Sequence, residues 1–186
     1  NESFMSGVKD IITTLKLKGT YGKVGNDQIG DSYDRFFYLS QVNMNGTGYW
    51  FGEDRSYRSG ITINRYANPL ITWEVAKKAN VGIELGLFND LTILADFFHE
   101  TRSNILQDRA DIPTTMGIRG IPQANLGVAE GKGFEVELKY QKSFNRHLWL
   151  TVNGNFTYAT SKFKENEEPD YSDVPWRSKI GTKLSQ

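Results

Sequence analysis

The chain of 186 residues contains no cysteine, only five prolines and no long apolar run. The lack of cysteine excludes disulfide bridges, thiolate metal sites and cysteine nucleophiles within it. Its longest unbroken apolar segment, residues 36–39, is far shorter than the roughly 20 residues that a membrane-spanning helix requires. The 22 basic and 22 acidic side chains cancel, so no net charge favours nucleic acid as a partner.

Aromatic residues and glycine are plentiful instead, with 11 Phe, 9 Tyr, 4 Trp and 18 Gly. This mixture favours strands and turns over helices. The mean hydropathy of −0.51 argues against a helical membrane protein. It does not argue against a membrane β-barrel, because only every second residue of a barrel strand faces lipid.

Apolar and polar residues alternate along much of the chain with a period of two, which is typical of β-strands. The clearest case is residues 132–141, where Phe134, Val136 and Leu138 alternate with Glu135, Glu137 and other polar residues. A helix would mix the two sets, because its period is about 3.6 residues. The alternation predicts six strands, near residues 11–24, 77–88, 91–102, 132–142, 147–161 and 176–186.

The connections between these strands alternate in length. In chain order they are long at 25–74, short at 88–90, long at 103–130, short at 143–146 and intermediate at 165–175. This pattern is typical of outer-membrane barrels, whose short turns face the periplasm and whose long loops face outside. Residues 33–60 are expected to add a hairpin within the first long connection.

Six strands do not close a membrane barrel, because the smallest single-chain barrels have about eight. An open edge in lipid leaves backbone groups unpaired, at a cost on the order of several kcal/mol for each group. The sequence also begins at Asn1 without an initiator methionine and ends at Gln186 within an expected strand. A soluble sheet protein and a segment of a larger barrel both remain possible, and these ends favour the segment.

Five segments, in order and at compatible spacing, resemble the barrel of SusC/RagA-like TonB-dependent outer-membrane transporters. They are LKLKGTYGKVGND at 15–27, ANPLITWE at 67–74, NVGIELGLFN at 80–89, DFFHETRS at 96–103, and NLG at 125–127 followed by GKGFE at 131–135. Gly131 stands where the family usually has Asn, and the segment around Leu70 is one residue shorter than usual. Each motif is weak alone, but the five together cover nearly the whole chain.

The resemblance implies an all-β fold, a segment of an antiparallel transmembrane barrel of about 22 strands with a plug in its lumen. It implies import of oligosaccharides or peptides across the bacterial outer membrane, with a SusD-like surface lipoprotein as lid and TonB as the source of energy. No plug domain or TonB box is recognisable in the chain. No enzymatic activity, cofactor or metal is expected.

The two faces of the strands are expected to meet different environments. The residues expected to face lipid are Val81, Ile83, Leu85, Phe134, Val136, Leu138, Tyr140, Leu150, Val152 and Phe156. The residues expected to face the lumen are Lys16, Lys18, Glu84, Asp96, Glu100, Glu135, Glu137 and Lys139. For each lumen residue, a hydrated wall with charges paired across strands is favoured over a substrate-guiding role. The candidates for interfacial aromatic girdles, all near expected strand ends, are Trp73, Trp149, Tyr158 and Trp176, with ordinary core or loop packing as the competing interpretation.

Signals for catalysis or metal binding are weak. His99-Glu100 begins like a zinc-protease motif, but Ser103 stands where the second histidine is required. A calcium loop starting at Asp27 lacks the glycine and glutamate of the EF-hand template. The acidic residues between 165 and 170 are expected to be solvated.

Two other functions compete with transport. A soluble glycan-binding module would use Trp50 and Trp73 as stacking platforms, and it would need a second sheet to cover the apolar face. A hydrolase would use Asp96 and Glu100. These two residues would lie about 13 Å apart along one strand, beyond the roughly 6.5–9.5 Å of an inverting glycosidase pair.

Overall fold

The computed structural model describes residues 7, 11–28 and 36–184. Within this part the elements are the strands β1 (Ile12–Asn26), β2 (Gln41–Phe51), β3 (Ser56–Arg65), β4 (Glu74–Leu87), β5 (Leu91–Asp108), β6 (Gln123–Asn145) and β7 (Leu148–Glu165) and the 3-10 helices η3 (Thr114–Met116) and η4 (Pro175–Arg177). Across those same residues, no helix has the length and apolar character needed to cross a membrane.

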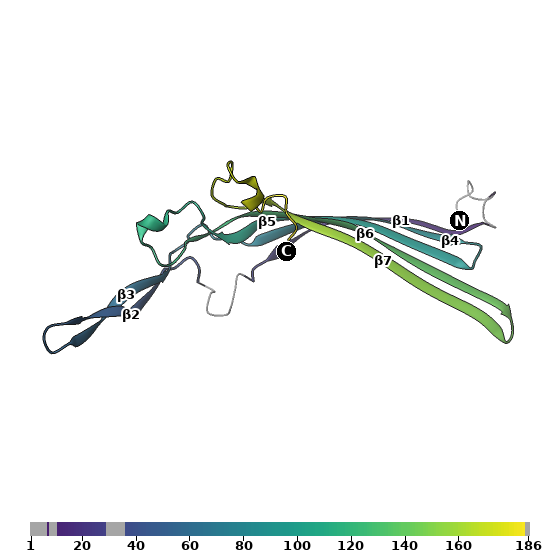
Figure 1. Cartoon of the computed structure of the whole chain (residues 1–186). Helices are drawn as coiled ribbons and strands as arrows, with labels where there is room; N and C mark the ends of the chain where they lie inside the picture. The colour runs from purple at the N-terminus through teal and green to yellow at the C-terminus, as the bar shows by residue number, and fades with distance from the viewer. Residues whose placement is uncertain (1–6, 8–10, 29–35, 185–186) are drawn as a thin grey trace.

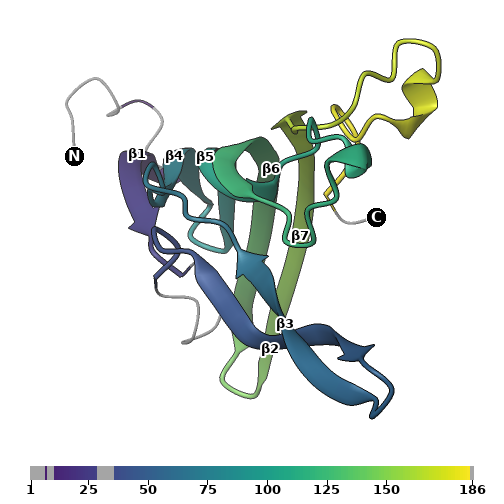
Figure 2. The ribbon, with the colours of Figure 1, turned by 90° about the vertical axis from the view of Figure 1, so that its left-hand side faces the viewer.

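Five strands form one antiparallel sheet in the order β1-β4-β5-β6-β7, and β2 pairs with β3 alone. Figure 1 shows the sheet as a long, gently curved band with the β4–β5 and β6–β7 turns at one end. The β2–β3 hairpin and the connection that carries η3 lie at the other end, and Figure 2 shows the hairpin passing in front of the sheet. The predicted antiparallel all-β fold and the separation of long from short connections are confirmed.

The short turn between β4 and β5 has a geometry that suits a hairpin. Phe88 and Asn89 both have positive φ, at 54° and 60°, and the Asp90 N–H donates to the Leu87 carbonyl at 3.1 Å. Two central residues of positive φ match the right-handed twist of paired strands. The turn therefore holds β4 and β5 in register from Leu87–Leu91 onward.

The hairpin expected within residues 33–60 forms as β2 and β3, over residues 41–65. Residues 33–35 of that expectation lie outside the described part. Trp50 and Tyr57 are paired across it, with ring centroids 5.1 Å apart. The hairpin shares no strand pairing with the main sheet.

Two strands are longer than the predicted 91–102 and 132–142. β5 continues to Asp108 and β6 begins at Gln123, so the connection predicted at 103–130 shrinks to residues 109–122. The register shifts between Arg102 and Ile105 and again before Leu106. Such irregularities break the alternation of side chains while the backbone pairing continues, and the sequence pattern therefore underestimated both strands.

The sixth strand predicted at 176–186 is wrong for the residues described, 176–184. Pro175, which has no N–H to give a ladder, begins the turn η4 instead. The chain then folds back on the end of β7, where the Gly181 N–H donates to the Phe163 carbonyl at 2.8 Å. Only two isolated bridges result, so the length of β7 is not paired by this segment.

The described part of the molecule has almost no interior. Phe37 and Ala129 are its only buried hydrophobic residues, at 7% and 4% exposure. On the sheet itself, Val81 and Phe156 are 64% and 59% exposed. Among the described residues the one other sheet is the β2–β3 hairpin, and it leaves these side chains uncovered, unlike the second sheet that a soluble glycan-binding module requires.

Candidate functional site

Strand register sorts the side chains of the sheet into two faces. Directly paired residues of antiparallel strands point to the same side, and one such row is Val81, Phe97, Phe134 and Tyr158. By this register the predicted lipid-facing residues share one face, the apolar face: Val81, Ile83, Leu85, Phe134, Val136, Leu138, Tyr140, Leu150, Val152 and Phe156. The predicted lumen-facing residues share the other, the polar face: Lys16, Lys18, Glu84, Asp96, Glu100, Glu135, Glu137 and Lys139.

Aromatic side chains form a cluster on the apolar face, toward the end with the long connections. The ring of Phe134 lies 6.0 Å from Phe97, 5.9 Å from Tyr158 and 5.8 Å from Phe156, measured between centroids. This arrangement is typical of an interfacial aromatic girdle. Trp149 pairs with Ser143 and lies on the polar face, whereas Trp73 and Trp176 lie outside the strands. Of the four girdle candidates, only Tyr158 occupies the apolar face.

On the polar face, opposite charges are paired across neighbouring strands. Lys16 and Lys18 of β1 place their Nζ atoms 3.1 and 3.3 Å from the carboxylate of Glu84 on β4. Glu137 and Lys139 form a further pair at 2.9 Å, but along β6 rather than across strands. Exposed pairs of this kind contribute little each, on the order of 0–1 kcal/mol, but they leave a hydrated, nearly neutral wall.

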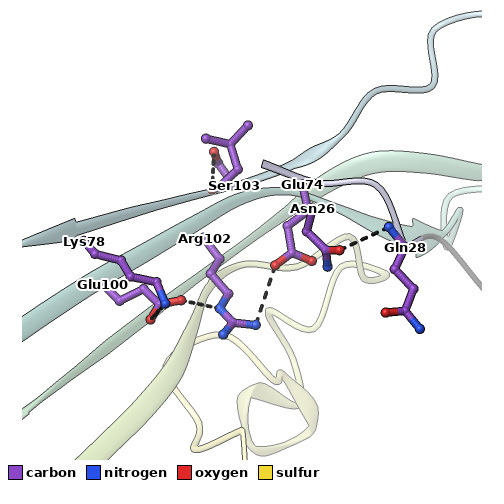
Figure 3. A network of polar contacts seen from close by, with 8 residues as sticks. Asn26, Gln28, Glu74, Lys78, Glu100, Arg102 and Ser103 are labelled. Atoms are coloured by element: carbon purple, nitrogen blue, oxygen red, sulfur yellow. Dashed lines mark hydrogen bonds and ion pairs between the residues drawn. The ribbon is translucent and has the colours of Figure 1, made fainter. Parts of the chain in front are cut away.

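A longer chain of ion pairs joins β4 to β5 near the end of the sheet that carries the long connections, here called the outer end (Figure 3). The Arg102 guanidinium lies 2.5 Å from Glu100 and 3.6 Å from Glu74. Lys78 approaches Glu100 from the other side at 3.4 Å. Because Glu100 is held by two cations, it is poorly placed to act with Asp96 as a hydrolytic pair.

A hollow of about 490 Å³ lies in the middle of the polar face, lined mainly by acidic and amide side chains. Asp96 and Glu135 are paired directly across β5 and β6 there, and no ion pair joins either to another described residue. Like charges directly opposite each other are destabilising. No group of three or more metal-binding side chains is found in the described part of the chain.

A second cavity, of about 530 Å³, lies where the long connections meet the sheet. Asn125 forms its framework: its side chain accepts from the Thr72 N–H at 3.0 Å and donates to the carbonyls of Thr72 and Asn104 at 2.9 Å each. Asn68 donates to the Gln123 carbonyl at 3.0 Å. Two motif segments, at 67–74 and 125–127, are thereby locked together.

The cavity is lined mostly by side chains that the sequence had not singled out. Its polar lining includes Asn26, Gln28, Gln41, Asn64, Arg65, Glu74 and Gln123. Amide groups both donate and accept hydrogen bonds, and such a lining suits the peptide bonds of a peptide or the hydroxyls of a sugar. Of the lining residues, only Asn26, Thr72, Glu74 and Asn125 belong to the motif segments that carried a sequence signal.

The two tryptophans of the glycan-stacking hypothesis do not form one platform. Trp50 packs on Tyr57 in the hairpin, whereas Trp73 lies over Gly25, where a Cβ atom would meet its ring at 2.9 Å. No contact between the two is found among the described residues. The stacking hypothesis therefore has no geometric support here.

The acidic segment after β7 is structural and not merely solvated, which corrects that prediction. Arg109 lies 2.6 Å from Glu167. Glu168 accepts from the Ser178 hydroxyl, from the Lys179 N–H at 2.9 Å and from Asn166 at 3.2 Å. Burial acts to raise the pKa of Glu168, but these hydrogen bonds outweigh it and hold the pKa below its ordinary value.

A single antiparallel sheet with one apolar face, one charge-paired face and its long connections at one end is typical of an outer-membrane barrel wall. The profile of the family described as "TonB dependent receptor-like, beta-barrel" matches residues 6–183, and the chain belongs to that family. This is a family of outer-membrane receptors and transporters, not of enzymes.

Known relatives agree with this assignment. The chain is 28% identical over 175 residues to TonB-dependent receptor P39 and 30% identical over 158 residues to TonB-dependent receptor P26, both of Formosa agariphila. These alignments cover 91% and 83% of this chain but only 15% of each relative.

Solved structures give the same result. The RagAB peptide transporter is similar with a TM-score of 0.63 and 26% identity, over 84% of this chain and 16% of that one. An "open-open" state of the RagAB peptide importer gives a TM-score of 0.65 and 25% identity. The resemblance to SusC/RagA-like transporters is confirmed, and the chain spans about one sixth of the length of these neighbours.

Proposed function

We propose that this chain forms part of the barrel wall of a transporter that imports oligosaccharides or peptides across the outer membrane. The observation that carries the proposal is the one-layer sheet, whose apolar face is uncovered and whose polar face is charge-paired. In this arrangement the apolar face contacts lipid and the polar face lines the lumen or contacts the plug. The chain performs no chemistry on the substrate.

The amide-rich cavity at the outer end supports a polar substrate. It lies at the side of the long connections, which face outside in such barrels, and its volume of about 530 Å³ suits a short peptide or oligosaccharide segment. RagAB is a peptide transporter by its description, which favours peptide as the first substrate class to test.

A SusD-like surface lipoprotein is the proposed lid, and the β2–β3 hairpin supports such a partner. Tyr49, Trp50 and Phe51 near its tip are 76%, 67% and 58% exposed. A two-stranded hairpin is at best marginally stable alone, and aromatic residues are enriched in protein interfaces. TonB would supply the energy through parts of the protein outside this chain.

The test is uptake by cells that do or do not carry the gene of the full-length protein. Labelled peptides and labelled oligosaccharides are supplied separately, with and without an uncoupler that collapses the proton-motive force. The proposal predicts uncoupler-sensitive uptake of one class, with the substrate recovered chemically unchanged, and loss of that uptake on deletion. Uptake of both classes that is unchanged by deletion would contradict it.

A further inference from the structure

Beyond the aromatic cluster, the apolar face ends in a group of charged side chains, here called the outer basic patch: Lys132, Lys162 and Lys164 with His99 and Glu130. His99 is paired with Lys132, and Glu130 with Lys162, across neighbouring strands. Each of these residues lies an even number of positions from Phe97, Phe134 or Tyr158 along the same strand. They therefore point to the same side of the sheet as the apolar face.

The patch carries more positive than negative charge. Glu130 is its one carboxylate, and its side chain is only 15% exposed. Its Oε1 lies 2.7 Å from Nε2 of His99. Lys162 and Lys164 place their Nζ atoms 3.7 and 3.9 Å from the same carboxylate and remain 45% and 54% exposed. One acid thus holds two lysines side by side without neutralising both, and Lys132 adds a further exposed cation.

The position of the patch matches a particular depth in a membrane. Lys132 lies two residues from Phe134, and Glu130 lies four, or about 7 and 13 Å along the strand. A barrel tilt of about 35–45° reduces these steps to roughly 5–10 Å along the membrane normal. The polar headgroup layer on each side of the hydrocarbon core is about 5–8 Å thick, so Lys132 lies at headgroup level and Lys162, which is paired with Glu130, lies at its outer edge.

We propose that the outer basic patch binds the phosphate of a membrane-lipid headgroup in the outer leaflet. Lysine is a point-charge ligand for phosphate, and basic residues at the membrane surface are attracted to anionic headgroups. The apolar face just below the patch accommodates the acyl chains of the same lipid. The opposite end of the face differs, because its Lys142 is paired one-to-one with Asp90 at 2.9 Å.

This inference rests on the proposed function, because it needs the apolar face in lipid. The test uses the full-length protein, purified in detergent, and titrates it with bis-phosphorylated lipid A, with dephosphorylated lipid A and with inorganic phosphate. Binding is followed by native mass spectrometry and by the shift in melting temperature. The variant combines Lys132→Gln, Lys162→Gln and Lys164→Gln, and the matched control combines Lys16→Gln, Lys18→Gln and Lys139→Gln on the polar face.

The proposal predicts that the wild type binds bis-phosphorylated lipid A and prefers it to the dephosphorylated form. The patch variant should bind it about tenfold or more weakly, whereas the control variant binds as the wild type does. Equal affinity for both lipids, full competition by equimolar inorganic phosphate, or unchanged binding by the patch variant would overturn it.

The two proposals fail in distinguishable ways. A full-length protein absent from the outer-membrane fraction would overturn the proposed function. A protein that resides there and transports its substrate, yet binds lipid A equally well with and without the patch, would overturn only the lipid site.

Discussion

At the residue scale, single side chains explain why several motif positions are what they are. The side-chain amide of Asn125 accepts from the Thr72 N–H and donates to the Thr72 carbonyl. These are the two hydrogen bonds that the backbone of a neighbouring strand would make with Thr72. Phe98 is an apolar residue on the polar face. Its ring lies over Gly133, where a Cβ atom on residue 133 would collide with the ring. Phe98 thereby covers the exposed backbone of the facing strand.

Asn125→Ala is expected to loosen the cavity of about 530 Å³ that Asn125 frames. The change leaves the Thr72 N–H and the carbonyls of Thr72 and Asn104 without this partner, at a cost of about 1–3 kcal/mol. Hydrogen exchange on the full-length protein should show faster exchange of residues 66–73 and 104–108, with the centre of the sheet unchanged. Asn153→Ala, at an exposed site on the polar face, is the control and should change neither, and equal exchange in both variants would contradict the role given to Asn125.

At the scale of elements, the segment after β7 depends on a carboxylate. The hydrogen bonds of Glu168 to Ser178 and Lys179 fix residues 176–184 against the end of β7. Because the pKa of Glu168 is lowered in the folded state, its stabilising contribution is complete above the ordinary carboxyl pKa of about 4.3. The contribution is lost as the pH falls through the lowered pKa.

We therefore expect residues 176–184 to open on acidification before the sheet does. Hydrogen exchange, corrected for the intrinsic rate and compared at about pH 6 and about pH 3, should show the loss in this segment alone. Glu168→Gln should weaken the segment already at the higher pH and remove most of its pH dependence. The control Asp173→Asn, at an exposed site in the same connection, should behave as the wild type, and a segment insensitive to both pH and Glu168→Gln would refute this anchoring.

Sequence alone predicted which residues share a face of the strands, because alternation is a local property that register then preserves. Which face meets lipid stays a prediction. It failed where pairing continued through an irregular backbone, as at residues 103–108 of β5. It also failed at 176–184, where Pro175 begins the turn η4 and the chain folds back on the end of β7 instead of pairing along it. The hydrogen bonds that frame the cavity could not be predicted from the sequence, because Asn125 binds Thr72, which is 53 positions away.

At the scale of the whole molecule, the sheet is incomplete. β1 and β7 are its two edges, and no described strand pairs with their outer sides. In a membrane each unpaired backbone group costs on the order of several kcal/mol. In water the apolar face would stay exposed to solvent. The segment therefore needs further strands on both sides, as a larger barrel provides.

Residues 1–186 expressed alone are expected to aggregate or associate through these edges. Size-exclusion chromatography in detergent, with circular dichroism on the same fractions, should give no monodisperse monomer of 21.1 kDa with stable β-structure. The full-length protein, handled identically, should give one. A well-behaved monomer of the segment would show that its edges do not require partners.

The most direct test of the central claim is cysteine scanning along β6, since the chain has no cysteine of its own. Each residue from 134 to 140 is replaced singly by cysteine in the full-length protein, freed of any other cysteine, and exposed in membranes to a water-soluble maleimide. The account predicts labelling at positions 135, 137 and 139, and protection at 134, 136, 138 and 140 until the membrane is dissolved. Uniform labelling, or the reverse alternation, would contradict a sheet with one face in lipid and the other in water.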